Sequence, residues 1–92
     1  MKIPKQVKIN GHYYSVNIGD LDSEELGFCK PSENCISINT RKQARSQQEE
    51  TLLHEIIEAI NFNNELKLEH PQITALSTTL YQVLKDNNFL PN

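Results

Sequence analysis

Residues 51–63, T-L-L-H-E-I-I-E-A-I-N-F-N, constrain the fold of this chain more than any other stretch. Apolar residues recur there at three- and four-residue steps, which is the period of a half-buried helix. They are Leu52, Leu53, Ile56, Ile57 and Ile60. A helix this apolar must bury its stripe against other elements, so the rest of the chain is expected to supply the layers that cover it.

The same segment carries a compact polar group of His54, Glu55 and Glu58. Residues four apart share one helix face, so His54 and Glu58 point the same way, with Glu55 about 100° round the helix. This layout resembles the zinc hydrolase motif H-E-x-x-H, with glutamate in place of the second histidine. His54 and Glu58 are therefore candidate zinc ligands, and Glu55 is the candidate catalytic general base. A histidine and glutamates at this spacing also occur on ordinary solvated helix faces.

A zinc hydrolase site needs a third protein ligand, and two histidines with one carboxylate form a common set. His70 precedes Pro71, and proline favours the first turn of a helix, so a second helix is expected over residues 71–87. If the two helices pack antiparallel, His70 completes the set of two imidazoles and one carboxylate. Glu69 is the alternative third ligand, and it would give a harder set that admits other divalent ions.

The remaining segments predict an α+β fold with a small antiparallel sheet made of two hairpins. The first hairpin, in residues 3–18, turns at Asn10-Gly11, a dipeptide that tolerates the positive φ values of a tight turn. The second, in residues 28–39, turns through P-S-E-N and offers a strand beside the metal helix on which an extended peptide could pair.

Helix boundaries and faces follow from local patterns. Ser46, with Glu49 three residues later, fits a capping box, so the first helix is expected to begin near Ser46 or Gln47. The second helix is expected to bury one apolar stripe against it. That stripe consists of Ile73, Leu76, Leu80, Val83 and Leu84.

Composition limits the classes of function. The 92 residues predict one domain, 1–92, and a hydrophobic content of 37% implies a modest core that a metal would help to stabilise. A net charge of −3 argues against a nucleic-acid partner. The sequence contains no run of 18 apolar residues, so no membrane span is predicted. The N-terminus lacks the apolar core of a secretory signal, so the cytoplasm is the expected compartment. The oligomeric state is left open.

Cys29 and Cys35 flank the predicted second turn. In a reducing cytosol they are expected to be free thiols. Their spacing also suits opposite positions across a hairpin, where a disulfide is geometrically conceivable. The chain has no C-x-x-C unit that would indicate a separate zinc site.

Taken together, three stretches resemble small phage and prophage proteins related to the ImmA/IrrE-type metallopeptidases. They are G-F-C-x-x-x-x-x-C-I-S-I-N, then E-T-L-L-H-E-I-I-E-A-I, then L-S-T-T-L-Y-Q-V-L-K-D-N, within residues 27–88. The resemblance implies a zincin-like domain, with His54 as first zinc ligand and Glu55 as catalytic base. Glu58 stands where the family has its second histidine, and Glu69-His70 lies where a third ligand is expected.

The resemblance implies a zinc-dependent peptidase that acts on a protein or peptide substrate. The alternative is a catalytically degenerate zincin-like domain that serves as a protein-binding module, since Glu58 departs from the family motif. A phage structural or assembly accessory is a third interpretation.

Overall fold

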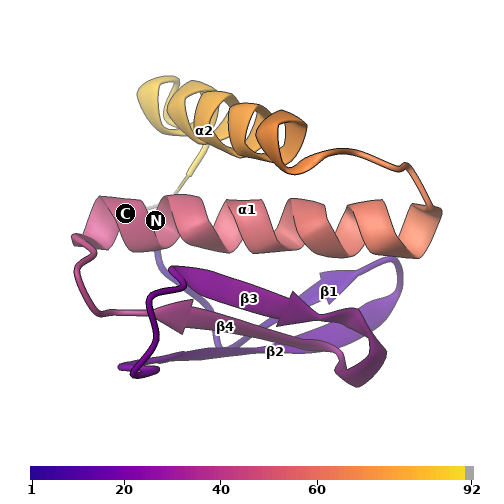
Figure 1. The fold of residues 1–92 in the computed structure, drawn as a ribbon. Helices are drawn as coiled ribbons and strands as arrows, with labels where there is room; N and C mark the ends of the chain where they lie inside the picture. Colours follow the sequence, from indigo (N-terminus) through magenta and orange to yellow (C-terminus); the bar gives the residue numbers. More distant parts are fainter. Residues whose placement is uncertain (91–92) are drawn as a thin grey trace.

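The computed structural model describes residues 1–90, and its fold is α+β, with three layers (Figure 1). A four-stranded sheet forms one layer, helix α1 covers one face of it, and helix α2 packs on the far side of α1. In chain order the elements are β1 (Gln6–Ile9), β2 (His12–Gly19), β3 (Gly27–Lys30), the short 3-10 turn η1 (Pro31–Glu33), β4 (Cys35–Asn39), α1 (Arg45–Asn64) and α2 (His70–Asp86).

The strand order is β1-β2-β4-β3, so β1 and β3 are the two edges of the sheet. Both predicted hairpins are confirmed, because β1 pairs antiparallel with β2 and β3 pairs antiparallel with β4. The two hairpins join through β2 and β4, which run parallel. The expectation of a purely antiparallel sheet is therefore corrected to a mixed one. Two adjacent hairpins can meet in either direction, and neither turn sequence specifies which.

Left-handed backbone conformations form both hairpin turns. Asn10 and Gly11 have φ values of 51° and 86°, as the Asn-Gly turn requires. In the second hairpin, η1 ends at Asn34 with a φ of 50°, and the Asn34 N–H donates to the Pro31 carbonyl at 3.2 Å. Asparagine tolerates this region better than most residues, which explains its position at both turns.

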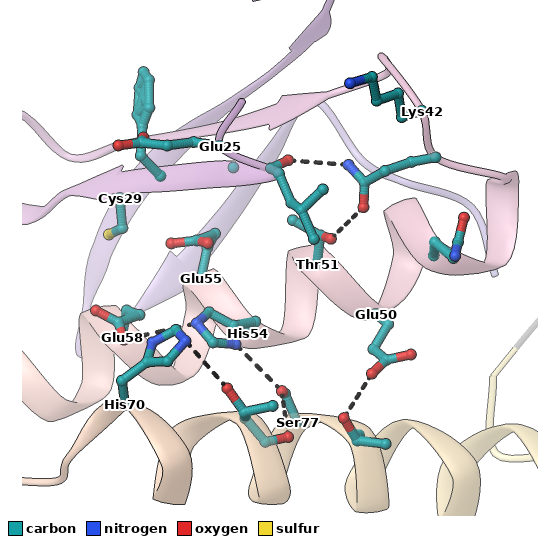
Figure 2. A pocket seen from close by; sticks show the side chains of 17 residues that line it. Glu25, Cys29, Lys42, Glu50, Thr51, His54, Glu55, Glu58, His70 and Ser77 are labelled. Atoms are coloured by element: carbon teal, nitrogen blue, oxygen red, sulfur yellow. Dashed lines mark hydrogen bonds and ion pairs between the residues drawn. The ribbon is translucent and has the colours of Figure 1, made fainter. Parts of the chain in front are cut away.

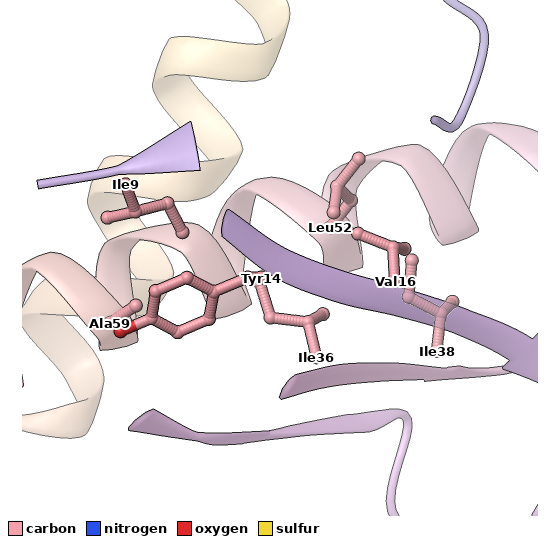
Figure 3. Packing of buried hydrophobic residues seen from close by; sticks show 7 residues of the cluster. All are labelled: Ile9, Tyr14, Val16, Ile36, Ile38, Leu52 and Ala59. Carbon is pink, nitrogen blue, oxygen red and sulfur yellow. The ribbon is translucent and has the colours of Figure 1, made fainter. Parts of the chain in front are cut away.

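The core lies between the sheet and α1 (Figure 3). Alternate residues of the two central strands point to the same face, and there they meet the buried side of the helix. Its buried members are Ile9, Tyr14, Val16, Ile36, Ile38, Leu52 and Ala59. The apolar stripe expected for the first helix thus finds its cover in the sheet on one side and in α2 on the other.

Helix α1 begins at Arg45, close to the predicted start, but its capping residues differ from the prediction. The Gln47 side chain accepts a hydrogen bond from the Ala44 N–H at 2.7 Å, so the proposed box of Ser46 and Glu49 is wrong. Glu49 is instead buried and accepts a hydrogen bond from the Tyr81 hydroxyl at 2.7 Å. A carboxylate that binds a neighbouring helix is not free to cap its own.

Helix α2 is present as predicted, but its buried stripe is different. The buried row is Ile73, Ser77 and Tyr81, whereas Leu76, Leu80 and Val83 are 49%, 42% and 38% exposed. Because α1 is the element of residues 1–90 that α2 mainly packs against, α2 buries one narrow row of side chains rather than a full apolar face. The exposed leucines and valine form one wall of an apolar groove between the helices. No helix within residues 1–90 combines the length and apolar character of a membrane span.

Candidate metal centre

Helix α1 places two of the predicted ligands one above the other. His54 Nε2 lies 3.8 Å from Glu58 Oε1, the contact expected for residues four apart on a helix. Both side chains are partly buried where α1 faces the first half of α2. His54 and Glu58 therefore already share one small volume before any third residue is considered.

The connection between the helices brings His70 to the same point. Glu65 and Lys67 both have positive φ values, 50° and 61°, which turn the chain sharply after α1. The Asn61 side chain then clamps Leu68, because its Oδ1 accepts from the Leu68 N–H at 2.9 Å and its Nδ2 donates to the Leu68 carbonyl at 3.4 Å. Helix α2 starts directly after this clamp, with His70 as its first residue.

His70 packs against His54, with ring centroids 5.2 Å apart and ring planes inclined by 58° (Figure 2). One ligand atom from each of His54, Glu58 and His70 lies within 4.8 Å of the others, a group that could hold a metal ion. Tetrahedral zinc holds such atoms roughly 3.3 Å apart, as follows from ligand distances of about 2.0–2.1 Å. The separations in the structure, at most 4.8 Å, therefore exceed this value by about 1.5 Å or less, which small side-chain movements would remove on binding an ion.

The donor set fits zinc by its chemistry, since two imidazoles and one carboxylate are a common set of three protein ligands. Glu69, the alternative third ligand, lies outside this group among the described residues. It is the N-cap of α2, and its N–H donates to the Gln72 side chain at 2.8 Å while its own side chain is exposed. Of the two candidates, the structure thus brings His70 rather than Glu69 to the shared point.

Glu55, the candidate general base, follows His54 on α1 and lines the same cleft. The residue is only 6% exposed, and within residues 1–90 its carboxyl oxygens accept no hydrogen bond from protein groups but keep access to the cleft described below. Burial, with the negative charges of Glu58 and Glu25, raises the pKa of Glu55 from 4.5 to about 7. A carboxyl group that lines a cleft and whose pKa is raised by burial and by neighbouring negative charges is a candidate functional group.

The carboxyl group of Glu55 faces an open cleft of about 740 Å³ (Figure 2). Its walls come from the loop before β3, from β3 itself, and from the facing sides of α1 and α2. Strand β3 is an edge strand and contributes Gly27, Phe28 and Cys29 to the wall. The edge beside the metal helix is therefore β3, because β4 lies inside the sheet between β2 and β3.

Gly27 is a site residue that sequence reasoning missed. A Cβ at this position would lie 2.8 Å from both the Ser37 carbonyl oxygen and Thr51 Cγ2, and 3.5 Å from Glu55 Oε2. Only glycine lets the edge strand approach α1 this closely. The glycine stands directly before the F-C of the predicted strand, but nothing in the local sequence shows which helix residue it meets.

Cys29 and Cys35 are free thiols, as predicted. Cys29 pairs with Ile36 across the hairpin, whereas Cys35 pairs with Lys30. Since Cys35 and Ile36 are adjacent on one strand, the two thiols point to opposite faces of the sheet, which excludes the conceivable disulfide. Cys29 points toward α1 and the cleft, and burial with the nearby charge of Glu55 raises its pKa to about 12.

The site combines three convergent side chains that could hold a metal ion, a largely buried carboxyl group with a raised pKa, and an open cleft beside β3, an outer strand of the sheet. Together these features can hold a divalent ion, position a proton acceptor next to it and admit an extended chain. Comparison of the chain with protein-family models, with curated proteins and with solved structures finds no match.

Proposed function

We propose that this protein is a small zinc-dependent metallopeptidase, zincin-like and of the ImmA/IrrE type, that hydrolyses peptide bonds. The observation that carries the proposal is the convergence of His54, Glu58 and His70 beside the largely buried Glu55, whose carboxyl group opens on the cleft. Three ligands alone would equally suit a structural ion. A proton acceptor that is not a ligand, and that has no other partner among the described residues, favours a hydrolytic site.

His54, Glu58 and His70 would hold the ion and leave a fourth position open toward the cleft. A zinc ion bound there would polarise the scissile carbonyl group and lower the pKa of a water molecule to about 7. Glutamate and histidine have exchanged places relative to H-E-x-x-H, but the total of two imidazoles and one carboxylate is unchanged. The charge that the ligands place around the ion is therefore that of an ordinary hydrolase set.

Glu55 would accept a proton from the attacking water and deliver it to the leaving amine. A general base must be ionised at the operating pH, and without an ion the pKa of Glu55 is about 7. The positive charge of a bound cation would lower this pKa, which keeps the carboxylate available as an acceptor. The roughly 100° between Glu55 and His54 on α1 keeps the base off the line of ligands.

An extended peptide is the substrate class that the cleft favours. Strand β3 has one unpaired edge that borders the cleft, so a peptide can add to it as a further strand through backbone hydrogen bonds. Pairing with β3 would carry the peptide past Glu55, because Gly27 lies at the start of the strand and a Cβ placed there would be 3.5 Å from Glu55 Oε2.

Cleavage of a peptide library by the zinc-loaded protein tests this proposal, with mass spectrometry as the readout. Glu55→Gln should abolish cleavage while the zinc content is preserved, because it removes the proton acceptor and leaves the three ligands intact. Glu50→Gln is the matched control, since Glu50 also lines the cleft from α1 but hydrogen-bonds to the Thr78 hydroxyl at 2.6 Å. Cleavage that survives in Glu55→Gln would refute the assigned base.

A second candidate function is a catalytically degenerate domain that binds another protein. It is favoured by the apolar groove of about 420 Å³ on the opposite flank of α2 from the cleft, lined by Leu66, Leu76, Leu80 and Val83 among others. Exposed apolar surface of this kind is typical of interaction sites. Absence of cleavage by the zinc-loaded wild-type protein, together with complex formation lost on Leu80→Glu, would favour this function over the peptidase.

A further inference from the structure

Helix α2 places the hydroxyl group of Ser77 next to the ring of His54, one of the candidate ligands. Ser77 belongs to the buried row of α2 and is only 2% exposed, with its Oγ 3.5 Å from His54 Nδ1. Its neighbours in that row, Ile73 and Tyr81, fill the interface between the helices. A small polar residue in this position leaves a hydroxyl where the helices could otherwise hold an apolar side chain.

The hydrogen of that hydroxyl already has an acceptor. Ser77 Oγ donates to the Thr74 carbonyl oxygen at 3.1 Å, a bond to the preceding turn that serine often makes in helices. A hydroxyl has one hydrogen and two lone pairs, so Ser77 faces His54 with a lone pair. The contact at Nδ1 is then a hydrogen bond only if Nδ1 carries the proton.

The contact with Ser77 affects which of the two ring nitrogens of His54 carries the proton. Above the ordinary histidine pKa of about 6.5 an imidazole is uncharged and carries a single N–H, on one nitrogen or the other. A proton on Nδ1 leaves Nε2 as a bare lone pair, and Nε2 is the atom that lies 3.8 Å from Glu58 in the centre of the site. In the opposite tautomer the Nε2–H would point at the position of the ion and toward the Glu58 carboxylate, so the Ser77 contact acts against the attraction of Glu58 for that hydrogen.

We propose that Ser77 is a positioning residue that holds His54 in the Nδ1–H tautomer and so directs Nε2 to the metal centre. Histidine ligands in metal sites are commonly oriented in this way, through an acceptor at the second ring nitrogen. The consequence for zinc rests on the proposed function, whereas the tautomer itself does not. A related contact occurs at the other ring, where Thr74 Oγ1 lies 3.5 Å from His70 Nε2.

The tautomer is measured by NMR on the zinc-free protein, at a pH well above the ordinary histidine pKa. Long-range correlations between the ring protons and the ring nitrogens distinguish a protonated Nδ1 from a protonated Nε2. We expect His54 to be Nδ1–H in the wild-type protein and to shift toward Nε2–H in Ser77→Ala, where the acceptor is gone. A wild-type His54 in the Nε2–H form would overturn the proposal, whether or not the protein binds zinc.

Zinc affinity supplies the second readout. Loss of an outer partner of a histidine ligand lowers metal affinity about 10–100-fold, which is the loss expected for Ser77→Ala. Thr79→Ala is the matched control, because Thr79 is exposed on the same helix and lines the apolar groove rather than the cleft. An equal affinity for zinc in Ser77→Ala and Thr79→Ala would refute the positioning role. Loss of folding in Ser77→Ala would leave the wild-type tautomer as the deciding result.

Discussion

Replacement of Glu55 by glutamine should stabilise the zinc-free protein at high pH and have little effect at low pH. Its carboxyl group has a pKa of about 7 in the folded protein, because burial disfavours the charged form, against 4.5 when solvated. Below about pH 4.5 the group is protonated in both the folded and the unfolded state. Above about pH 7 the folded protein must hold a buried carboxylate, which the unfolded chain exposes to water.

The size of the effect follows from the two pKa values. They differ by about 2.5 pH units, and each unit corresponds to about 1.4 kcal/mol, so the ionised form of Glu55 costs the folded state about 3 kcal/mol. This cost is absent at low pH, grows between about pH 4.5 and pH 7, and is complete above that range. Glutamine has nearly the same shape and no charge, so Glu55→Gln removes the cost.

Urea denaturation in the presence of a chelator measures the difference. The free energy of unfolding of Glu55→Gln should exceed that of the wild-type protein by about 3 kcal/mol at about pH 8, and the excess should nearly vanish at about pH 4.5. Contributions to the free energy of unfolding that the two proteins share are removed when one is subtracted from the other. Glu50→Gln serves as the control and should show no such pH-dependent gain. An equal stability of Glu55→Gln and the wild-type protein at both pH values would refute the raised pKa of Glu55 and the burial that causes it.

Two further substitutions test how the site is held together. Gly27→Ala should destabilise the protein by about 1–3 kcal/mol, because the new Cβ would lie 2.8 Å from a backbone oxygen of β4. Gly19→Ala is the control and should leave the stability unchanged, because its Cβ would meet nothing within 4 Å. Thermal denaturation of both variants measures the difference. Tyr81→Phe should cost about 2 kcal/mol in urea denaturation, because it removes the hydrogen bond to the buried Glu49 carboxylate, and an unchanged stability would show that this bond does not hold α2 on α1.

Features set by local chemistry were predictable from the sequence. The Asn10-Gly11 turn follows from the φ preferences of two adjacent residues, and the shared face of His54 and Glu58 follows from the helical period. The proximity of His70 to His54 was expected on the condition that the two helices pack antiparallel, which a short connection favours but does not force. Each of these inferences depends on residues near one another in the chain.

Features set by packing between distant segments were not predictable. The parallel pairing of β2 with β4 depends on how two hairpins meet, and the exposure of Leu76 and Leu80 depends on α2 packing mainly against α1 within the described part of the chain. A stripe of apolar residues shows that a face can be buried but not whether a partner exists. For the same reason the role of Gly27 against Thr51 and Glu55 is visible only in the fold.

Zinc stoichiometry tests the central claim most directly. Equilibrium dialysis followed by elemental analysis should give one zinc ion per chain for the wild-type protein. His70→Ala should lose more affinity than the about 10–100-fold expected for an outer partner. His12→Ala, which removes an exposed histidine at the start of β2, should bind zinc as the wild-type protein does. A wild-type protein that retains no zinc after dialysis, or a His70→Ala variant that retains it fully, would contradict the assignment of His54, Glu58 and His70 as a metal centre.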